Sequence, residues 1–450
     1  MSYQVTIEPT GDIIEVEEGQ TILSAALRQG VWLPFACGHG TCATCKCQLV
    51  EGEADQGEAS PFALLDTERD DGKILACCAM PESDLVIEAE IDVDPDFAGH
   101  LVADYTATVS AIETLSPTIK GLTLALDRDM TFQAGQYINL QLPGIEGTRA
   151  FSIANAPSNP GRIELHIREI PDGAATGYIH NELKVGDEIE FSGPYGQFFV
   201  RKSDPKDVLF IAGGSGLSSP ESMILDLLES GDERQITLFQ GARNGTELYH
   251  RERFEQLTER HSNFTYVPAL NEPVEEDNWQ GFTGFVHEAA VAHFYGKFAD
   301  HKAYLCGPPL MIDAAINALM KGRLFEKDIH MEKFVTAADG ANEVQRSALF
   351  KRIQGMNWAT HTIKLSNRDG QFYCNEQQSL LHGVESQRIK AVQVGCRGGG
   401  CGVCKIRVLS GEFFSKKMSK KHVSADELNQ GMGLSCRIFP RSDMVIEALD

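Results

Sequence analysis

Apolar and polar residues alternate in two short segments at the start of the chain, Tyr3–Ile7 and Ile13–Val16, with Gly11-Asp12 between them. This alternation predicts a β-hairpin, because side chains of a strand point to opposite faces in turn and Gly-Asp suits a tight turn. A short helix is expected over residues 21–29.

Short alternating segments separated by Gly or Pro continue from residue 105 to about residue 193. They are Thr106–Val109, Ile119–Leu126, Tyr137–Leu142, Ala150–Ala154, Ile163–Ile167 and Glu188–Phe191. Strands at this spacing are typical of an antiparallel barrel. The alternation places Arg149 and Phe151 on one side of a strand, where a guanidinium can pair with a phosphate and a ring can cover an apolar edge.

Strand-like and helical patterns alternate over residues 205–335, which predicts a parallel, doubly wound sheet. The strand-like segments are Val208–Ala212, Ile236–Gln240, Phe264–Val267, Ala303–Cys306 and His330–Phe334, and the clearest helical ones are Ser219–Glu229 and Leu310–Met320. The first strand runs into Gly213-Gly214-Ser215-Gly216-Leu217, where small residues let the backbone approach a pyrophosphate. Ser219 stands where G-x-G-x-x-G would end, so a plain tight turn remains an alternative.

The chain has 12 cysteines, six of them between Cys37 and Cys78 and four between Cys396 and Cys436. Four in the first group have the plant-type C-x4-C-x2-C...C spacing of a 2Fe-2S cluster, namely Cys37, Cys42, Cys45 and Cys77. A zinc site usually shows two paired short spacings instead.

The cysteine pattern returns at the other end of the chain, displaced by a constant 359 residues. The second set is Cys396, Cys401, Cys404 and Cys436. The register continues outside the ligands, since residues 81–88 align with residues 440–447, and it selects Cys77 over Cys78 as the fourth ligand. The chain therefore contains two copies of one iron-sulfur unit.

Composition indicates a soluble globular protein of several domains, with 450 residues, 42% apolar and 23% charged. The start lacks a secretory signal pattern and no segment is long and apolar enough for a bilayer, so we expect a cytoplasmic enzyme without membrane or nucleic-acid partners. In that compartment, clustered cysteines favour redox or metal chemistry over disulfides.

The net charge of -24 is uneven along the chain. Residues 1–100 hold 4 Lys+Arg and 20 Asp+Glu, a balance of -16, whereas residues 356–450 hold 13 and 9, a balance of +4. Simple solubility accounts for this, and so does electrostatic steering of two ends toward differently charged partners. The sequence leaves both readings open.

Residues 1–353 resemble the reductase components of multicomponent phenol hydroxylases, which belong to the ferredoxin–NADP reductase superfamily. The resemblance rests on the first cysteine loop, Arg149-Ala150-Phe151-Ser152, the glycine turn, Tyr304–Pro309 and His330–Phe334. Residues 356–450 resemble the chloroplast-type ferredoxins found with enzymes of aromatic-ring degradation. Together they imply a multidomain α+β and α/β protein with two β-grasp ferredoxins, a β-barrel FAD domain and a doubly wound NAD domain.

The expected domains are a ferredoxin over 1–95, an FAD barrel over 103–204, an NAD domain over 205–336, a linker over 337–357 and a second ferredoxin over 358–450. The resemblance implies FAD ligands at Arg149, Phe151, Ser152, His166, Ile167, Arg168, Gly173 and Thr176. It implies contacts to NADH at Gly213, Gly214, Gly216, Leu217 and Gly307, and catalytic positions at Cys306, Glu332 and Phe334.

Several of these residues have plainer interpretations. His166 could be an ordinary strand histidine, and Cys306 and Phe334 could be core residues. Glu247 favours NADH, because an acid there can bind a ribose hydroxyl, whereas the neighbouring Arg243 favours a 2'-phosphate. We prefer NADH. Ser215 and Ser218-Ser219 also depart from the Thr and Ala common in related reductases.

The resemblance implies that electrons pass from NADH to FAD, then to the first 2Fe-2S cluster and to a di-iron hydroxylase of aromatic hydrocarbon catabolism. The second cluster would be another outlet, re-reducing the iron of catechol 2,3-dioxygenase. Two alternatives are clusters in series to one oxygenase and a non-enzymatic redox sensor or electron store. The chain itself is not expected to be the hydroxylase, because only Glu247–His250 fits the Glu-x-x-His pattern of a di-iron site.

Overall fold

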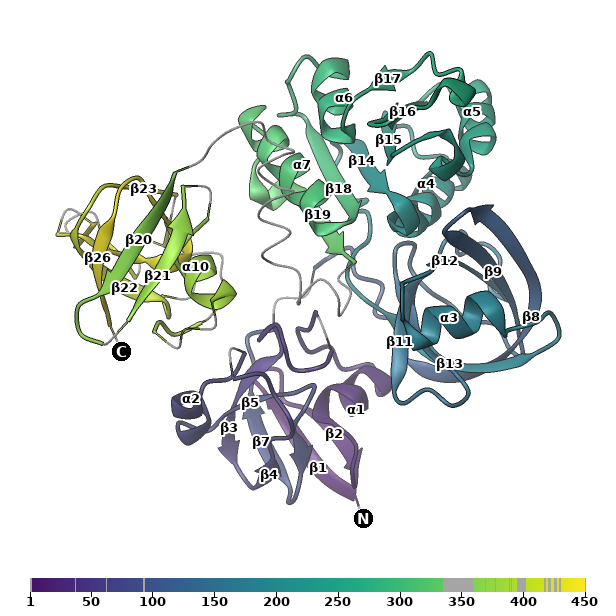
Figure 1. Ribbon diagram of the computed structural model, residues 1–450. Helices are drawn as coiled ribbons and strands as arrows, with labels where there is room; N and C mark the ends of the chain where they lie inside the picture. Colours follow the sequence, from purple (N-terminus) through teal and green to yellow (C-terminus); the bar gives the residue numbers. More distant parts are fainter. Residues whose placement is uncertain are drawn as a thin grey trace. The chain divides into compact units, whose positions relative to one another are not determined.

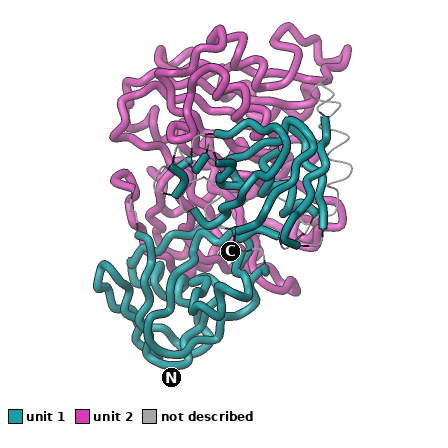
Figure 2. Tube along the Cα trace, turned by 90° about the vertical axis from the view of Figure 1, so that its left-hand side faces the viewer, with its two compact units in different colours: residues 1–92, 340–450 teal, residues 93–339 magenta. Residues whose placement is uncertain are grey.

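The computed structural model describes residues 2–36, 38–61, 63–91, 94–334, 359–368, 370–376, 378–387, 389, 391–394, 402–416, 418–419, 422–424, 427–428 and 430–449. It divides into two compact units, residues 1–92 with 340–450, and residues 93–339 (Figures 1 and 2). The linker expected over 337–357 lies outside the described residues.

The N-terminal domain is built on a five-stranded sheet with the order β2-β1-β7-β3-β5. The strands are β1 Ser2–Glu8, β2 Asp12–Glu17, β3 Lys46–Glu51, β5 Lys73–Leu75 and β7 Leu85–Glu88, and β4 Ala54–Asp55 pairs separately with β6 Met80–Pro81. The expected hairpin is confirmed by the antiparallel pairing of β1 and β2. The expected helix is α1 Ile22–Arg28, which begins where the Thr21 side chain accepts a hydrogen bond from the Ser24 N–H. A further helix is α2 Asp66–Asp70.

The C-terminal domain repeats this plan, with the strand order β21-β20-β26-β22-β24. Its elements are β20 Thr360–Leu365, β21 Gln371–Asn375, α10 Leu380–Ser386, β22 Lys405–Ser410, β23 Phe413–Ser415, β24 Met432–Leu434, the 3-10 helix η5 Ser435–Arg437, β25 Ile438–Pro440 and β26 Met444–Ala448. The repeat extends to single pairs: Asp55 lies opposite Met80, and Phe414 lies opposite Phe439, each displaced by 359 residues.

The antiparallel-sheet domain, residues 94–204, contains six strands in the order β11-β10-β13-β8-β9-β12. They are β8 Ala103–Ser116, β9 Ile119–Leu126, β10 Tyr137–Gln141, β11 Thr148–Ser152, β12 Arg162–Arg168 and β13 Glu188–Tyr195, and α3 is Ala174–Asn181. All six expected strands are present. A bridge between Ile153 and Leu165 brings the two edges of the sheet together.

The parallel-sheet domain, residues 205–334, has the strand order β17-β16-β15-β14-β18-β19, and every pairing is parallel. The strands are β14 Asp207–Gly213, β15 Ile236–Ala242, β16 Phe264–Leu270, β17 Phe282–Thr283, β18 His301–Gly307 and β19 Ile329–Lys333. The helices are α4 Ser218–Glu229, α5 Arg251–Arg260, α6 Val286–His293 and α7 Pro309–Lys321, with 3-10 helices η1 Gly214–Leu217, η2 Gly245–Glu247, η3 Glu275–Asp277 and η4 Glu326–Asp328. The doubly wound sheet is confirmed.

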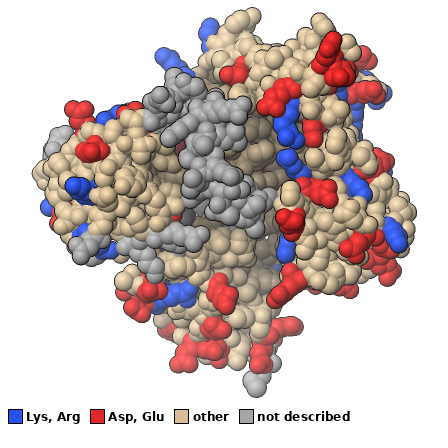
Figure 3. Space-filling model, in the orientation of Figure 1, with Lys and Arg blue, Asp and Glu red and all other residues tan. Residues whose placement is uncertain are grey.

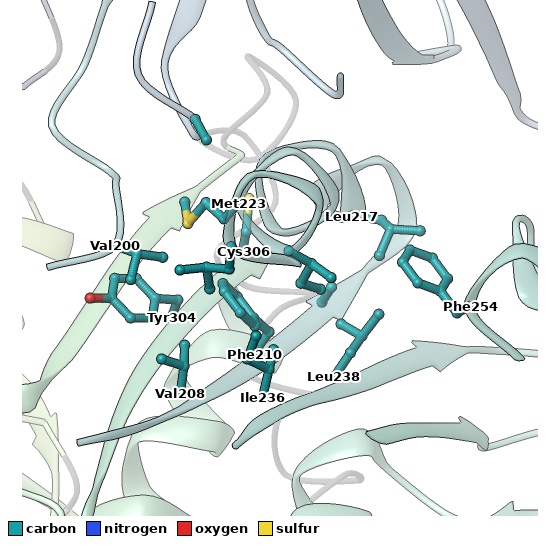
Figure 4. Packing of buried hydrophobic residues seen from close by; sticks show 14 of the residues in the cluster. Val200, Val208, Phe210, Leu217, Met223, Ile236, Leu238, Phe254, Tyr304 and Cys306 are labelled. Carbon is teal, nitrogen blue, oxygen red and sulfur yellow. The ribbon is translucent and has the colours of Figure 1, made fainter. Parts of the chain in front are cut away.

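The core of this domain positions the ends of its central strands. Phe210 of β14 and Tyr304 of β18 are fully buried, with ring centroids 5.5 Å apart (Figure 4). The sheet reverses its strand order between β14 and β18, and ligands of such sheets bind at the carboxyl ends of the strands at that point. In the part of the chain that the structure describes, no helix has the length and apolar character needed to cross a membrane.

Candidate functional site

The first cysteine loop folds over the end of the N-terminal domain. Among its predicted ligands, Cys45 and Cys77 are buried and Cys42 is half-buried, while Cys37 lies outside the described residues. The Gly40 N–H donates to Cys77 Sγ at 3.2 Å. A Cβ on Gly40 would lie 2.7 Å from Cys78 Sγ, and Gly40 has φ +77°, so the loop requires glycine here. Thiols with a backbone donor aimed at them fit the needs of a 2Fe-2S cluster.

The second cysteine set is described in part. Cys404 and Cys436 are buried, and Cys396 and Cys401 lie outside the described residues. The hydrogen bond from Cys436 is the main cause that lowers the pKa of the Cys404 thiol. The hydrogen bond stabilises the thiolate form of Cys404, which is the form that binds metal.

A half-buried carboxylate joins the two domains of the second unit. Glu332 Oε2, from β19, accepts hydrogen bonds of 3.0 Å from Ser152 Oγ of β11 and from Ser219 Oγ of α4. Cys306 Sγ, at the end of β18, lies 3.9 Å from the same oxygen. Burial raises the pKa of the Glu332 carboxyl, and it raises the pKa of the Cys306 thiol well above its ordinary value. The Cys306 thiol therefore stays protonated, and the Glu332 carboxyl ionises at a higher pH than an exposed glutamate does.

Phe334 directly follows β19 and contacts the end of β18. Its N–H donates to the carbonyl oxygen of Gly307 at 3.2 Å, and its side chain packs against the core that contains Cys306. The three predicted catalytic residues, Cys306, Glu332 and Phe334, thus lie together. Their packing is also that of core residues, so their catalytic role stays a prediction.

The glycine turn packs against the end of β18 backbone to backbone. A Cβ on Gly216 would lie 2.5 Å from Gly307 Cα, and one on Gly213 would lie 2.6 Å from Met311 Sδ. Gly214 has φ +57°, and a Cβ there would lie 3.4 Å from Arg168 Nη1. The turn therefore packs directly on β18 and leads into α4, and the Arg168 guanidinium lies beside Gly214. A turn of small residues at the start of a helix suits a pyrophosphate.

The predicted flavin residues lie on β11, β12 and the start of α3. Arg149 is exposed, and its Nη1 donates to the carbonyl oxygens of Glu146 and Thr148 at 3.2 and 2.9 Å. Phe151 packs against the core of the antiparallel-sheet domain. The Thr176 hydroxyl accepts from the Ile170 N–H at 3.0 Å and so fixes the loop that carries Gly173.

Ile167 and His166 are held by hydrogen bonds within the protein. The carbonyl oxygen of Ile167 lies 2.8 Å from His180 Nε2. His166 Nδ1 lies 3.1 Å from the Tyr249 hydroxyl, and its Nε2 lies 3.9 Å from Glu221 Oε2. Burial lowers the pKa of His166 to about 4. His166 thus faces the parallel-sheet domain, and its predicted place near the FAD phosphates stays a prediction.

Glu221 is the centre of a buried polar cluster that the sequence did not indicate. Its Oε2 is 2.9 Å from His250 Nδ1, and its Oε1 is 2.6 Å from Arg253 Nη1. Burial alone would raise its pKa, but the His250 hydrogen bond and the nearby cations lower it. The one available signal was a single acid in the first turn of α4, among serines and just before an apolar run.

Ser219 is a second residue that pattern reading passed over, although its departure from G-x-G-x-x-G was visible. Glu247 also has an unexpected contact: its Oε2 accepts from Thr118 Oγ1 at 3.0 Å and from Ser116 Oγ at 3.3 Å, and Arg243 Nη2 lies 3.7 Å from its Oε1. These hydroxyls compete with a ribose for the carboxylate, so the choice of NADH through Glu247 stays a prediction.

Family models match every part of this architecture. The model described as an oxidoreductase FAD-binding domain matches residues 106–200, and that of an oxidoreductase NAD-binding domain matches 210–317. The model of a 2Fe-2S iron-sulfur cluster binding domain matches twice, at 5–82 and 363–441.

Curated relatives match most of the chain. Phenol 2-monooxygenase, reductase component DmpP, from Pseudomonas sp. (strain CF600) is 72% identical over 353 residues, which are 78% of this chain and 100% of that protein. The phenol hydroxylase P5 protein of Acinetobacter pittii (strain PHEA-2) is 68% identical over the same shares. The crystal structure of the Amycolatopsis reductase GcoB has a TM-score of 0.68 and 34% identity, covering 74% of this chain and 99% of its own.

Proposed function

Because this chain belongs to the family of the reductase components of phenol 2-monooxygenases, we propose that it takes electrons from NADH through FAD and a 2Fe-2S cluster to the oxygenase of such a system. The observation that carries the proposal is the meeting of Ser152, Cys306 and Glu332. These three side chains connect β11, the strand expected to hold flavin, with the ends of β18 and β19, which are expected to hold the nicotinamide.

The chemistry divides between the cofactor and these side chains. FAD, when bound, takes up a hydride from NADH and gives its two electrons away singly. Arg149 and Arg168 are available to pair with phosphates of FAD, and the Gly213–Leu217 turn is available to the pyrophosphate of NADH. Glu332 and Cys306 lie where they can orient the nicotinamide, and the ionised carboxylate favours the positive charge that this ring gains.

We also propose the finer architecture. The antiparallel sheet, whose edges meet at the Ile153–Leu165 bridge, is the FAD barrel, and the two duplicated domains are β-grasp ferredoxins that hold one cluster each. The proposed bounds are 1–95, 103–204, 205–336 and 358–450, with 337–357 as a linker. Each family-model match falls inside one of these ranges, which supports them.

We propose two outlets. The first cluster, on Cys37, Cys42, Cys45 and Cys77, serves a di-iron phenol hydroxylase. The second, on Cys396, Cys401, Cys404 and Cys436, serves another acceptor, for which catechol 2,3-dioxygenase is our candidate. The match to the Pseudomonas reductase component supports this separation, because it covers 100% of that protein and only 78% of this chain.

The test is NADH oxidation by the FAD-loaded, iron-loaded chain with ferricyanide or cytochrome c as acceptor. Steady turnover supports a reductase, whereas a single reduction without turnover would support the sensor or electron store. Cys306→Ala should slow reduction of the flavin by NADH at least about tenfold. Cys374→Ala, which removes a buried thiol of the C-terminal domain, is the matched control and should leave that rate unchanged.

A further inference from the structure

The two ferredoxin domains differ sharply at one equivalent place, a two-stranded sheet next to the fourth cysteine ligand. In the C-terminal domain β23 pairs with β25, and in the N-terminal domain β4 pairs with β6. The registers are identical after the shift of 359 residues, so the surfaces can be compared position by position.

The C-terminal sheet carries aromatic rings with cations on their faces. Phe414 is 50% exposed, and the Phe439 ring opposite it has its centroid 6.3 Å away. Lys416 Nζ lies 4.9 Å from the centre of the Phe439 ring, and Arg441 Cζ lies 5.7 Å from that of Phe414. We name these four residues the aromatic–cationic patch.

The N-terminal domain has Asp55, Gly57, Met80 and Glu82 at the four equivalent positions. The difference extends along the segment: residues 51–72 hold eight Asp+Glu and one Lys+Arg, a balance of -7, whereas residues 410–431 hold three and four, a balance of +1. Figure 3 shows acidic side chains gathered over the N-terminal domain, at the bottom of the view. Within one fold, the same surface has changed from acidic to aromatic and basic.

The patch lies close to the predicted second cluster along the chain. β25 begins two residues after Cys436, and the Lys416 N–H donates to the carbonyl oxygen of Arg437 at 2.8 Å. Electron transfer between proteins slows steeply with distance, so a protein that covers this sheet would be well placed to receive an electron. Arg441 is also pre-oriented, because its Nη1 donates to the carbonyl oxygen of Glu376 at 2.9 Å.

We propose that the aromatic–cationic patch is the docking surface for an electron acceptor protein whose own surface is acidic around its redox centre. The inference rests on the proposed function, since it identifies the partner class of the second outlet. The cations steer an acidic protein toward the patch. The exposed Phe414 ring, backed by the half-buried Phe439 ring, supplies an apolar contact at its centre. The acidic N-terminal sheet selects the opposite class.

The probes are cytochrome c, which is basic, and the same cytochrome with its lysines succinylated, which is acidic. NADH supplies two electrons, and each reduces one ferric haem. The patch variant combines Phe414→Asp, Lys416→Gly and Arg441→Glu. These changes introduce the residues of the N-terminal domain at three of the four patch positions and keep Phe439. The control variant combines Lys364→Glu and Arg407→Glu, two exposed positions of the same domain that give an equal change of charge.

The full-length holoprotein should reduce the succinylated probe in a salt-sensitive manner. At low salt the patch variant should do so about tenfold more slowly, while its rate with unmodified cytochrome c does not fall and the control variant stays within about twofold of the parent. Equal losses in the patch and control variants, or no loss in the patch variant, would overturn the proposal. So would a sedimentation experiment in which the parent dimerises and the patch variant does not, because the occupant would then be a second copy of this chain.

Failure of the proposed function would look different. In that case NADH would not reduce the second cluster, as followed by its electron paramagnetic resonance signal, in the parent or in any variant. Calorimetric binding of the succinylated probe would still test the patch, because binding needs no electron. Tighter binding to the parent than to the patch variant supports the docking surface, and equal binding overturns it.

Discussion

Glu332 is a half-buried residue whose carboxylate two hydroxyls from different domains hold in place. Burial raises its pKa above the ordinary 4.5. The native state therefore binds this proton more tightly than the unfolded state does. The contribution of Glu332 to stability is present at low pH and is lost as the pH rises through the raised pKa.

Glu332→Gln should remove this loss. The amide oxygen can still accept from Ser152 and Ser219, but it cannot ionise, so the free energy of unfolding should fall less with rising pH than in the parent. Reduction of the flavin by NADH should slow at least about tenfold, because the negative charge near the nicotinamide is gone. Denaturation curves at several pH values and stopped-flow absorbance measure the two effects. A variant with an unchanged pH dependence would show that Glu332 does not titrate in this range.

Gly216 is the residue at which the glycine turn touches β18. Gly216→Ala would place a Cβ 2.5 Å from Gly307 Cα, and neither backbone can move without displacing its strand or helix. We expect a loss of about 1–3 kcal/mol in stability and a raised KM for NADH. Gly177→Ala is the control: its Cβ meets nothing within 4 Å inside α3, so it should stabilise by about 0.5–1 kcal/mol. Thermal release of FAD fluorescence measures both, and equal effects would contradict the close approach.

At the residue scale, the spacing of the cysteines predicts the cluster ligands. The Gly40 N–H on Cys77 Sγ agrees with the choice of Cys77 over Cys78. The sequence could not indicate that Ser219 donates to Glu332, because the two residues are separated by 113 positions and meet only after the sheet has formed. Local patterns contain no information on such a contact.

At the scale of elements, the buried cluster around Glu221 joins β12 of one domain to α4 and α5 of the other. It includes His166 with a pKa lowered to about 4 by burial, against an ordinary 6.5. A depressed histidine is neutral in the native state and charged in the unfolded state below pH 6.5. Its contribution to stability is full above pH 6.5 and is lost as the pH falls toward 4, on the order of 3 kcal/mol in total.

His166→Gln should therefore flatten the fall in stability between pH 6.5 and 4. Tyr249→Phe is the matched comparison, since it removes the 3.1 Å contact to His166 Nδ1 but leaves the histidine to titrate. It should lower stability by about 1 kcal/mol at neutral pH and keep the acid-side loss. Denaturant titration monitored by flavin release measures the stability of both variants between pH 6.5 and 4. The same acid slope in both variants would mean that His166 is not the titrating group.

Elements with strong alternation or helical periodicity were the predictable ones. Most strands of the two central sheets were expected within a few residues of where they lie, because buried sheets require runs of apolar residues. The exception in length is β8, which was expected only over Thr106–Val109 and spans Ala103–Ser116. The helix α5, Arg251–Arg260, was not expected: its sequence RERFEQLTER is almost wholly charged or polar, and only Phe254 is buried. A helix that buries one aromatic ring shows little hydrophobic periodicity in its sequence. β17, with two residues, is too short to give any.

At the scale of the whole molecule, the 359-residue repeat predicts a C-terminal domain with the plan of the N-terminal one, and the strand orders of the two domains match. Internal duplication is readable from sequence because it preserves spacing across an entire domain. The divergence of the two copies at Asp55 and Phe414 is equally visible in the sequence, but its location on paired strands beside the fourth cysteine needed the structure.

The chain ended at residue 353 has the length of a complete relative and should fold, bind FAD and keep the first cluster. Its iron content should be half that of the full-length protein. In NADH-driven phenol turnover with the partner hydroxylase, we expect unchanged rates, because electrons reach that partner from the first cluster. Reactivation of oxidised catechol 2,3-dioxygenase should be lost. If phenol turnover collapses in a truncated protein that is folded and loaded with FAD, the two clusters act in series, and the second domain is a relay to the oxygenase.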